Sequence, residues 1–197
     1  MSKVVVFTNM TLDGVMQAPG RPDEDRRGGF EYGGWATPYA TMEAAEESMA
    51  NTGALLLGRR TYEDFYNFWP NRTDNPFTAV LNNTQKYVAS TTLEEPLSWI
   101  NSTLLKGDAA EAVAKLRQEP GKDLVILGSG ELIQSLMRHN LVDKYVLLIH
   151  PLVLGSGRHL FTDGGSFAAL RLFDTKMTTT GVMIATYQPD EPTARNM

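Results

Sequence analysis

Apolar residues along the chain occur in short continuous runs that alternate with stretches of helical spacing. The continuous runs are typical of strands that are buried on both faces, and the spaced residues indicate amphipathic helices. Strands are predicted at residues 4–7, 53–60, 77–83, 86–90, 97–100, 123–127 and 143–154, the last interrupted at Pro151. Helices are predicted at residues 41–51, 61–69, 107–118 and 131–139.

The last part of the chain has a different pattern. Residues 170–188, LRLFDTKMTTTGVMIATYQ, contain two β-type runs without a helix between them, which favours an antiparallel hairpin. Alternating strands and helices followed by such a hairpin indicate an α/β fold with a central, mostly parallel sheet and an antiparallel edge. Residues 1–188 are therefore predicted to form a single domain, and the polar residues 189–197 a C-terminal tail.

Composition narrows the range of partners. With 197 residues, 42% of them hydrophobic, the chain is long enough for one substantial core and too short for two. Its formal net charge of -5 leaves no basic surplus for nucleic acid or an anionic membrane, so small molecules are the expected ligands. No apolar stretch approaches the ~18 residues of a membrane span, and the first residues lack an export-type core. Because cysteine is absent as well, the cytoplasm is the expected location.

Two common kinds of catalytic site are not indicated. His139, His150 and His159 have neither the i, i+4 spacing of a helical zinc pair nor neighbouring acidic ligands, so no metal site is expected. The Gly-x-Ser-x-Gly elbow of serine hydrolases is also missing.

A Gly-Ser-Gly segment joins the strand at 123–127 to the helix that follows it. Gly128 and Gly130 allow backbone N–H groups to approach a ligand, and the helix N-terminus favours an anion such as phosphate. Alternatively, Gly128 permits a tight turn and Gly130 permits close helix packing. The segment is not the dinucleotide-binding Gly-x-Gly-x-x-Gly, because Ile133 occupies the third glycine position.

Two further strand ends carry polar residues. In ALLLGRRTYEDF, Arg59 and Arg60 stand at a helix start, where a guanidinium suits a phosphate such as the 2′-phosphate of an NADP-type coenzyme. They are alternatively solvated surface charges, and Thr61 with Asp64 also matches a helix-capping pattern. After KYVAS, the hydroxyls of residues 90–92 lie at a strand end, where they could equally form a turn.

Five segments, in their order and spacing, resemble the dihydrofolate reductase superfamily, most closely its branch that contains the reductase domain of riboflavin biosynthesis. They are VVVFTNMTLDGVMQ, LLLGRRTYEDF, KYVAS, LVILGSGELIQSLM and HPLVLGSGRHLF, and the resemblance runs from about Val4 to Tyr187. It implies a three-layer dihydrofolate reductase-like fold, an NADPH site and hydride transfer to a small heterocycle, carbonyl or imine. The substrate would be similar to 5-amino-6-(5-phosphoribosylamino)uracil, and the protein a homodimer.

The resemblance also implies positions for the coenzyme. Its adenosine phosphate and pyrophosphate would meet Gly58, Arg59, Arg60 and Thr61. Ser90 and Thr91 would flank the adenine ribose, and the remaining pyrophosphate would be wrapped by Gly128, Ser129, Gly130, Glu131 and Leu132. The nicotinamide would lie near Asn9, Met16 and Gln17.

On the substrate side, Asp13 would be the catalytic carboxyl at the turn where the substrate approaches, or else a simple Asp-Gly turn former. The irregular residues 17–38 would form a lid whose Phe30, Tyr32 and Trp35 stack on a flat ring, or pack locally. The loop VLGSGRHLF would face this lid, although hairpin formation alone would explain its glycines.

The sequence also differs from the families that it resembles. The Pro-Trp element of folate reducers is not visible in the sequence, and neither are the Asp-Asp-Pro segment and the zinc-bearing deaminase domain of the riboflavin enzyme. A non-catalytic nucleotide-binding or ligand-sensing protein on the same scaffold is the alternative function.

Overall fold

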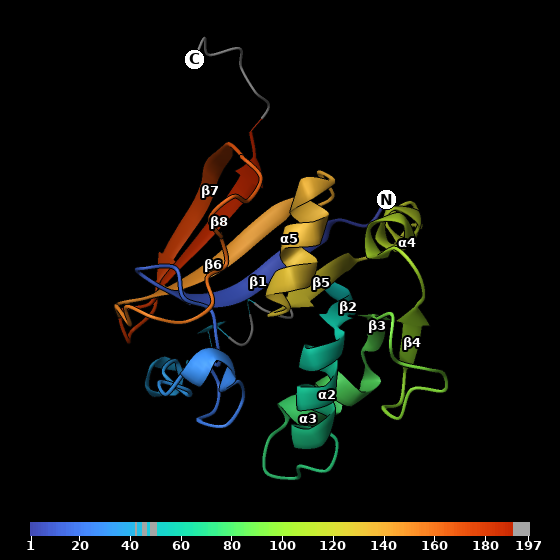
Figure 1. Cartoon of the computed structure of the whole chain (residues 1–197), viewed down its shortest axis with the longest axis horizontal. Helices are drawn as coiled ribbons and strands as arrows, with labels where there is room; N and C mark the ends of the chain where they lie inside the picture. The colour runs from blue at the N-terminus through green and yellow to red at the C-terminus, as the bar shows by residue number, and fades with distance from the viewer. Residues whose placement is uncertain (42, 45–46, 48–50, 191–197) are drawn as a thin grey trace.

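The computed structural model describes residues 1–41, 43–44, 47 and 51–190. Its eight-stranded sheet has the order β4-β3-β2-β5-β1-β6-β8-β7 (Figure 1). The strands are β1 Val4–Thr11, β2 Thr52–Gly58, β3 Gln85–Ala89, β4 Ser102–Leu105, β5 Asp123–Leu127, β6 Lys144–His150, β7 Leu170–Met177 and β8 Met183–Pro189. All neighbours are parallel except β6 with β8 and β8 with β7, which confirms the predicted antiparallel hairpin.

Helices cover both faces of the sheet and make three layers (Figure 1). They are α2 Arg59–Phe68, α3 Phe77–Asn83, α4 Ala109–Leu116 and α5 Gly130–Arg138, with short 3-10 turns η1 Arg27–Gly29 and η2 Thr37–Tyr39 in the lid segment. Strand residues alternate between the faces because successive side chains of a strand point to opposite sides. In β1, Val6 packs in the core under α4 and α5, and Phe7 packs in the core under α2 and α3.

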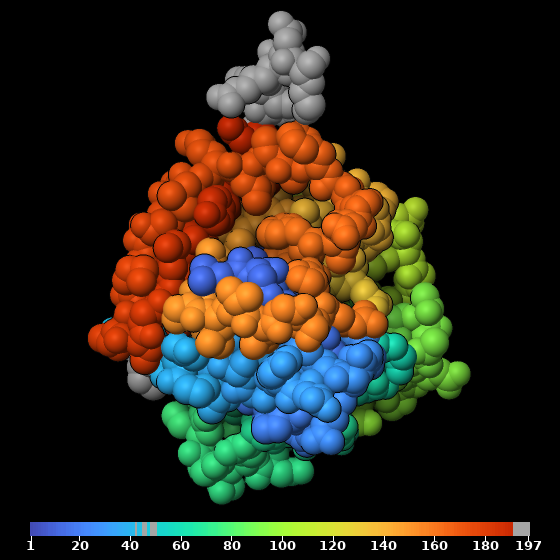
Figure 2. All heavy atoms as spheres, turned by 60° about the vertical axis from the view of Figure 1, so that its left-hand side comes forward, coloured from blue at the N-terminus to red at the C-terminus, as the bar shows by residue number. Residues whose placement is uncertain are grey.

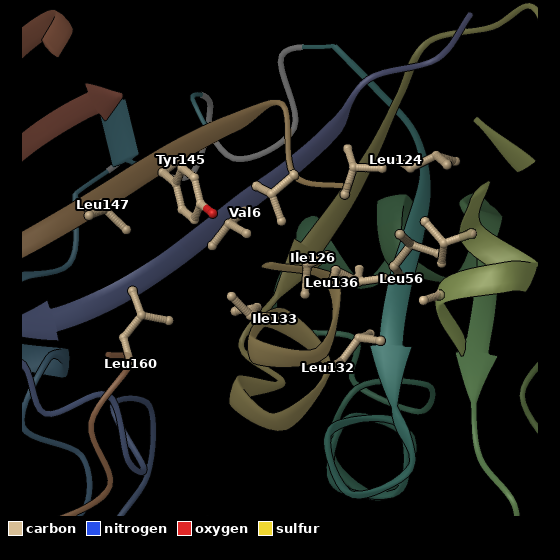
Figure 3. Packing of buried hydrophobic residues seen from close by; sticks show 14 of the residues in the cluster. Val6, Leu56, Leu124, Ile126, Leu132, Ile133, Leu136, Tyr145, Leu147 and Leu160 are labelled. Atoms are coloured by element: carbon tan, nitrogen blue, oxygen red, sulfur yellow. The ribbon is translucent and has the colours of Figure 1, made fainter. Parts of the chain in front are cut away.

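The core under α5 shows why these strands read as continuous apolar runs. Ile126 of β5 and Leu56 of β2 are fully buried against Ile133 and Leu136 of α5 (Figure 3). All five residues of β5 are buried. A strand covered on both faces has no position for an exposed polar side chain, so its sequence lacks polar alternation.

The prediction of a strand at residues 77–83 is wrong, because this segment is helix α3. Asn75 Oδ1 accepts a hydrogen bond from the N–H of the first helical residue at 2.9 Å, and Thr78 and Leu81 are buried at helical spacing. At the other end, the buried Lys86 Nζ donates to the carbonyl of Leu81 at 2.8 Å. Capping by Asn75 and by Lys86, both just outside the run, therefore decides between helix and strand for this short apolar segment.

The extended fragment predicted at residues 97–100 is also wrong. This segment is a series of bends, in which the backbone N–H of Trp99 donates to the hydroxyl of Tyr62 at 2.9 Å rather than to a strand. The strand that completes this edge, β4, begins two residues later at Ser102. The strand predicted to reach residue 154 ends as β6 at His150, directly before Pro151. The predicted helix at 41–51 and the predicted tail at 189–197 lie mostly outside the described residues, although the first residue of the tail, Pro189, ends β8.

Strand β7 forms an open edge of the sheet. Seven of its eight residues are exposed, including the apolar Leu172, Phe173 and Met177. Unpaired backbone beside exposed apolar side chains is a surface on which another strand can add. Among the helices of the described residues, none has the length and apolar character needed to cross a bilayer.

Candidate functional site

A cleft of about 1550 Å³ opens where the parallel strands end. This is the usual ligand site of open α/β sheets, because loops and helix N-termini meet at the carboxyl ends of the strands. The cleft is lined by all fourteen residues predicted to bind the coenzyme: Asn9, Met16, Gln17, Gly58, Arg59, Arg60, Thr61, Ser90, Thr91, Gly128, Ser129, Gly130, Glu131 and Leu132. Residues from four different strand ends are thus brought together, as the motifs predicted.

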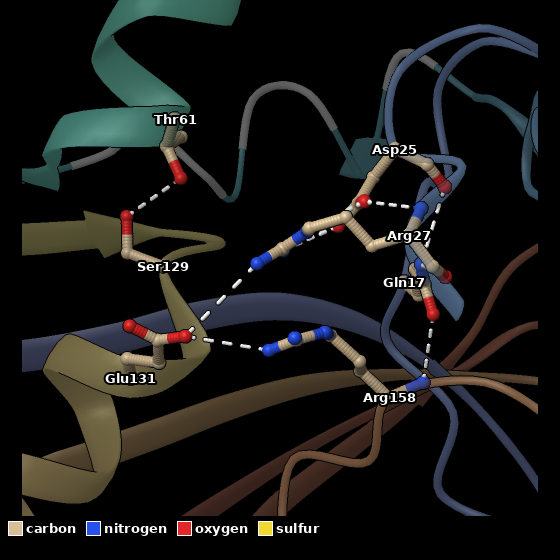
Figure 4. Close-up of polar contacts among 7 residues, drawn as sticks. All are labelled: Gln17, Asp25, Arg27, Thr61, Ser129, Glu131 and Arg158. Carbon is tan, nitrogen blue, oxygen red and sulfur yellow. Dashed lines mark hydrogen bonds and ion pairs between the residues drawn. The ribbon is translucent and has the colours of Figure 1, made fainter.

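Ser129 ties two of these strand ends to each other (Figure 4). Its Oγ accepts a hydrogen bond from the backbone N–H of Gly58 at 3.0 Å and donates to Thr61 Oγ1 at 2.9 Å. Ser129 adopts a left-handed conformation with φ of 61°, which directs its side chain toward the neighbouring junction. The alternative interpretation, in which Thr61 caps the helix, is wrong, because Thr61 is the third residue of α2.

We expect Ser129→Ala to lower the free energy of unfolding by about 2 kcal/mol, because the amide of Gly58 and the hydroxyl of Thr61 both lose a partner. Urea denaturation of Ser129→Ala, Thr61→Val and the double variant measures this. The cost of Thr61→Val should shrink in the Ser129→Ala background. Fully additive costs would mean that the two hydroxyls are not coupled.

The first turn of α5 lines the cleft, and its Gly130 packs closely against Met16. A Cβ at this position would lie 2.9 Å from the sulfur of Met16, so any larger residue would push Met16 out of place. This contact is the close packing of the alternative interpretation, and the approach of a ligand to Gly130 stays a prediction. The exposed N–H groups of this helix end are suited to an anion.

Two arginines meet the carboxylate of Glu131 at this helix end (Figure 4). Arg158 Nη1 lies 3.3 Å from Glu131 Oε1, and Arg27 Nη1 lies 4.0 Å from the same oxygen. Arg27 comes from the lid and Arg158 from the loop after β6. Both arginines line the cleft. Neither was predicted as a site residue from the sequence, although Arg158 lies in the Gly-Ser-Gly-Arg loop that was expected to face the lid.

Gln17 holds the lid in place from within (Figure 4). Its buried side chain donates from Nε2 to the carbonyls of Asp25 and Arg27, at 3.2 and 3.0 Å, and its Oε1 accepts from the backbone N–H of Arg158 at 2.9 Å. Figure 2 shows the result, in which the blue N-terminal segment lies directly beside the orange segment that follows β6. Gln17 thus joins three parts of the cleft wall.

The other cationic and hydroxyl residues lie at the opposite end of the cleft. Arg59 forms an ion pair with Glu63 at 3.3 Å, with both side chains about 40% exposed, and Arg60 is exposed. Ser90 Oγ accepts from the backbone N–H groups of Thr92 and Leu93 at 3.1 and 3.0 Å. Ser90 therefore forms a turn, as the alternative interpretation stated, and also lines the cleft.

Asp13 does not lie in the cleft wall. Its carboxylate accepts hydrogen bonds from the backbone N–H groups of Leu154 and Gly155, at 3.2 and 2.8 Å, and from the hydroxyl of Thr11. The Thr11 hydroxyl, followed by the two amides, holds the pKa of Asp13 below its usual value, although desolvation opposes the shift. A carboxylate held ionised in a loop junction is a poor proton donor, so the catalytic and substrate-binding role predicted for Asp13 is not supported by its position.

Phe30 and Trp35 also lie outside the cleft wall. They form a separate buried cluster with Val15, and Trp35 Nε1 donates to the carbonyl of Gln17 at 2.7 Å. The aromatic residues of the lid therefore pack locally, and the ring-stacking role predicted for Phe30 and Trp35 is not supported by their positions. Tyr32 is exposed at the edge of the Phe30 ring.

Glu24 is a lid carboxyl that does line the cleft. Its Oε2 accepts from the backbone N–H groups of Gly20 and Arg21, at 2.7 and 3.1 Å. Burial raises the pKa of Glu24, and the nearby carboxylate of Asp64 adds to this effect. Glu24 was not predicted as a site residue, because a single acidic residue in a loop with many charges has no spacing or motif that distinguishes it. Among the described residues, no cluster of His, Asp and Glu side chains has the arrangement of a metal site.

The chain is similar to proteins of one family along nearly its whole length. A family model described as the RibD C-terminal domain matches residues 2–186. The uncharacterized protein YyaP of Bacillus subtilis (strain 168) is 31% identical over 140 residues, which cover 68% of this chain and 72% of YyaP.

Two solved structures share the fold. A protein assigned to riboflavin biosynthesis in Shewanella sp. PV-4 has a TM-score of 0.72 at 22% identity, covering 97% of this chain and 100% of its own. Dihydrofolate reductase from Enterococcus faecalis, complexed with NADP(H), has a TM-score of 0.61 at 14% identity, covering 96% and 97%. These likenesses confirm the predicted three-layer, dihydrofolate reductase-like architecture.

Proposed function

Because the chain belongs to the RibD C-terminal domain family, we propose that it is an NADPH-dependent reductase of a small heterocyclic, carbonyl or imine substrate. The observation that carries this proposal is the convergence of all fourteen predicted coenzyme residues on one cleft. These residues come from separate motifs, and their meeting at the strand ends is not explained by turn formation or helix packing alone.

The cleft has the donors that a dinucleotide requires. The N-termini of α2 and α5 both open into it, and Gly130 at the start of α5 lines the cleft without a side chain to cover its backbone N–H. We propose Arg59 and Arg60 as ligands of the coenzyme's 2′-phosphate, because a guanidinium binds phosphate in a bidentate manner. Ser90 and Thr91 would lie against the adenine ribose.

Bound NADPH supplies a hydride, so the chain itself has to exclude water, align the reactants and supply a proton. Gln17 keeps the lid against the loop that carries Arg158 and so closes one side of the cleft. We propose Glu24 as the proton source in place of Asp13, since Glu24 lines the cleft and its raised pKa keeps more of it protonated at a given pH.

The first test is coenzyme discrimination. We expect the wild-type protein to bind NADPH more tightly than NADH, and Arg59→Ala to weaken NADPH binding by about 10- to 100-fold with little effect on NADH. Isothermal titration calorimetry measures both dissociation constants. Arg72→Ala, which removes an arginine paired with Asp74 in the segment between α2 and α3, is the matched control. Equal, weak binding of both coenzymes would refute the proposal.

We also propose that the protein forms a homodimer through the open edge at β7, where Leu172 and Phe173 are exposed. Light scattering during gel filtration should give twice the chain mass of 21.8 kDa. Phe173→Lys should shift the species to the monomer, because a charge at an apolar edge opposes strand addition. A monomeric wild-type protein at micromolar concentration would contradict this.

A further inference from the structure

A buried histidine lies under the lid at the end of β6. The side chain of His150 is 2% exposed, and its ring meets the rings of Trp35 and Tyr39 edge to face, with centroids 5.1 and 5.5 Å away. Its Nε2 lies 2.9 Å from Oδ1 of Asn9. Its Nδ1 is buried and has no hydrogen-bond partner among the described residues. Burial lowers the pKa of His150 to about 4, so the ring is neutral at pH 7.

These contacts decide which ring nitrogen carries the proton. A neutral imidazole has one N–H donor and one acceptor nitrogen. If Nδ1 carried the proton, an N–H group would be buried without an acceptor, which is rarer and costlier than an unpaired acceptor. The proton therefore sits on Nε2 and is donated to Oδ1 of Asn9.

The same bond fixes the amide of Asn9. Asn9 lies near the end of β1 and lines the cleft beside Thr8 and Met16. Its Oδ1 is occupied by His150, so the polar group that remains available to the cleft is the amide nitrogen with its two protons. Without the histidine, the amide could rotate and present its oxygen instead. A carbonyl oxygen of a ligand would be bound by the first orientation and repelled by the second.

We propose that His150 is a positioning residue, which holds the Asn9 amide so that its N–H groups donate to a carbonyl oxygen of the bound ligand. This inference rests on the proposed function, in which Asn9 lies near the nicotinamide, and it assigns the carbonyl to the nicotinamide carboxamide. The lid takes part, because Trp35 both packs on His150 and donates to the carbonyl of Gln17. A lid in place therefore keeps water away from the His150 to Asn9 hydrogen bond.

Two measurements test the proposal in the intact protein. Nitrogen-15 NMR of the histidine side chains at pH 7 should show His150 as a neutral ring protonated on Nε2, with the signals assigned by their loss in His150→Gln. Calorimetry should compare NADPH with 2′-phospho-ADP-ribose, which has the same phosphates without the nicotinamide ring. We expect His150→Leu and Asn9→Leu to weaken NADPH binding by about tenfold and to leave binding of the fragment unchanged.

Further variants separate positioning from packing. His150→Gln keeps an N–H donor for Asn9 and should restore most of the NADPH affinity that His150→Leu loses. His139→Leu, on the exposed end of α5, is the matched control and should change neither ligand. Equal losses in the Gln and Leu variants, or a proton on Nδ1, would overturn the inference. A wild-type protein that binds neither NADPH nor the fragment would instead overturn the proposed function, while the NMR result stands by itself.

Discussion

Glu24→Gln is expected to lower the rate of NADPH oxidation at pH 7 by about 100-fold or more, because an amide has no proton to donate to the reduced substrate. Binding of NADPH should stay within about threefold of the wild type, since the amide oxygen still accepts from the backbone of Gly20 and Arg21. Stopped-flow absorbance with a carbonyl and imine panel gives the rate, and titration gives the affinity.

The pH profile makes this test specific. Burial raises the pKa of Glu24, so the protonated fraction, and with it kcat/KM, should fall as the pH rises above that pKa. This dependence should be absent from Glu24→Gln. Asp13→Asn is the matched control: it changes another carboxyl of the same N-terminal segment, outside the cleft, and should keep its turnover. If Asp13→Asn loses activity and Glu24→Gln keeps it, the roles proposed here are reversed.

Gly157→Ala is expected to lower the free energy of unfolding by about 3 kcal/mol, which would lower Tm by about 10 °C. Gly157 has a φ of +126°, and a Cβ there would lie 2.6 Å from Val15 and 2.8 Å from the ring of Phe30. Both neighbours belong to the buried cluster that the lid forms with Val15, and they cannot move freely. Differential scanning calorimetry measures the change.

Gly155→Ala in the same loop is the control for this variant. Gly155 also has a positive φ, +74°, but nothing lies within 4 Å of a Cβ at that position. It should cost about 1 kcal/mol, the usual penalty of a left-handed alanine. Similar losses at Gly155 and Gly157 would mean that backbone conformation, rather than the contact with the lid, accounts for the effect.

The fold was predictable where hydrophobic patterns were long or fully buried. The run at β5 and the helical spacing of α5 identified their elements, since four adjacent apolar residues, Leu124 to Leu127, have no place on a half-exposed helix. Residues 77–83 were wrongly predicted as a strand because FTAVLNN is compatible with both a strand and a helix. Hydrogen bonds from Asn75 before the segment and Lys86 after it favour the helix. A short run contains no information about such partners.

The gathering of the proposed coenzyme residues in one cleft was predictable for a topological reason. Glycines and hydroxyls at the ends of parallel strands are brought to one edge of the sheet by the fold itself, so each motif could be located separately. The substrate side was not, because the roles of Asp13 and Trp35 depend on how a long irregular loop folds back on the chain. Asp13 accepts hydrogen bonds from the backbone amides of Leu154 and Gly155, which lie far away in sequence.

The position of β5 has a consequence for how this site forms during synthesis. β5 pairs with β1 on one side and with β2 on the other, although both precede it by a large part of the chain. A nascent polypeptide that ends before Asp123 therefore has no strand to join the two halves of the future binding edge. Contacts so distant in sequence form late and slowly. Dinucleotide added to a refolding reaction should thus stabilise only the finished sheet, and earlier intermediates should gain nothing from it.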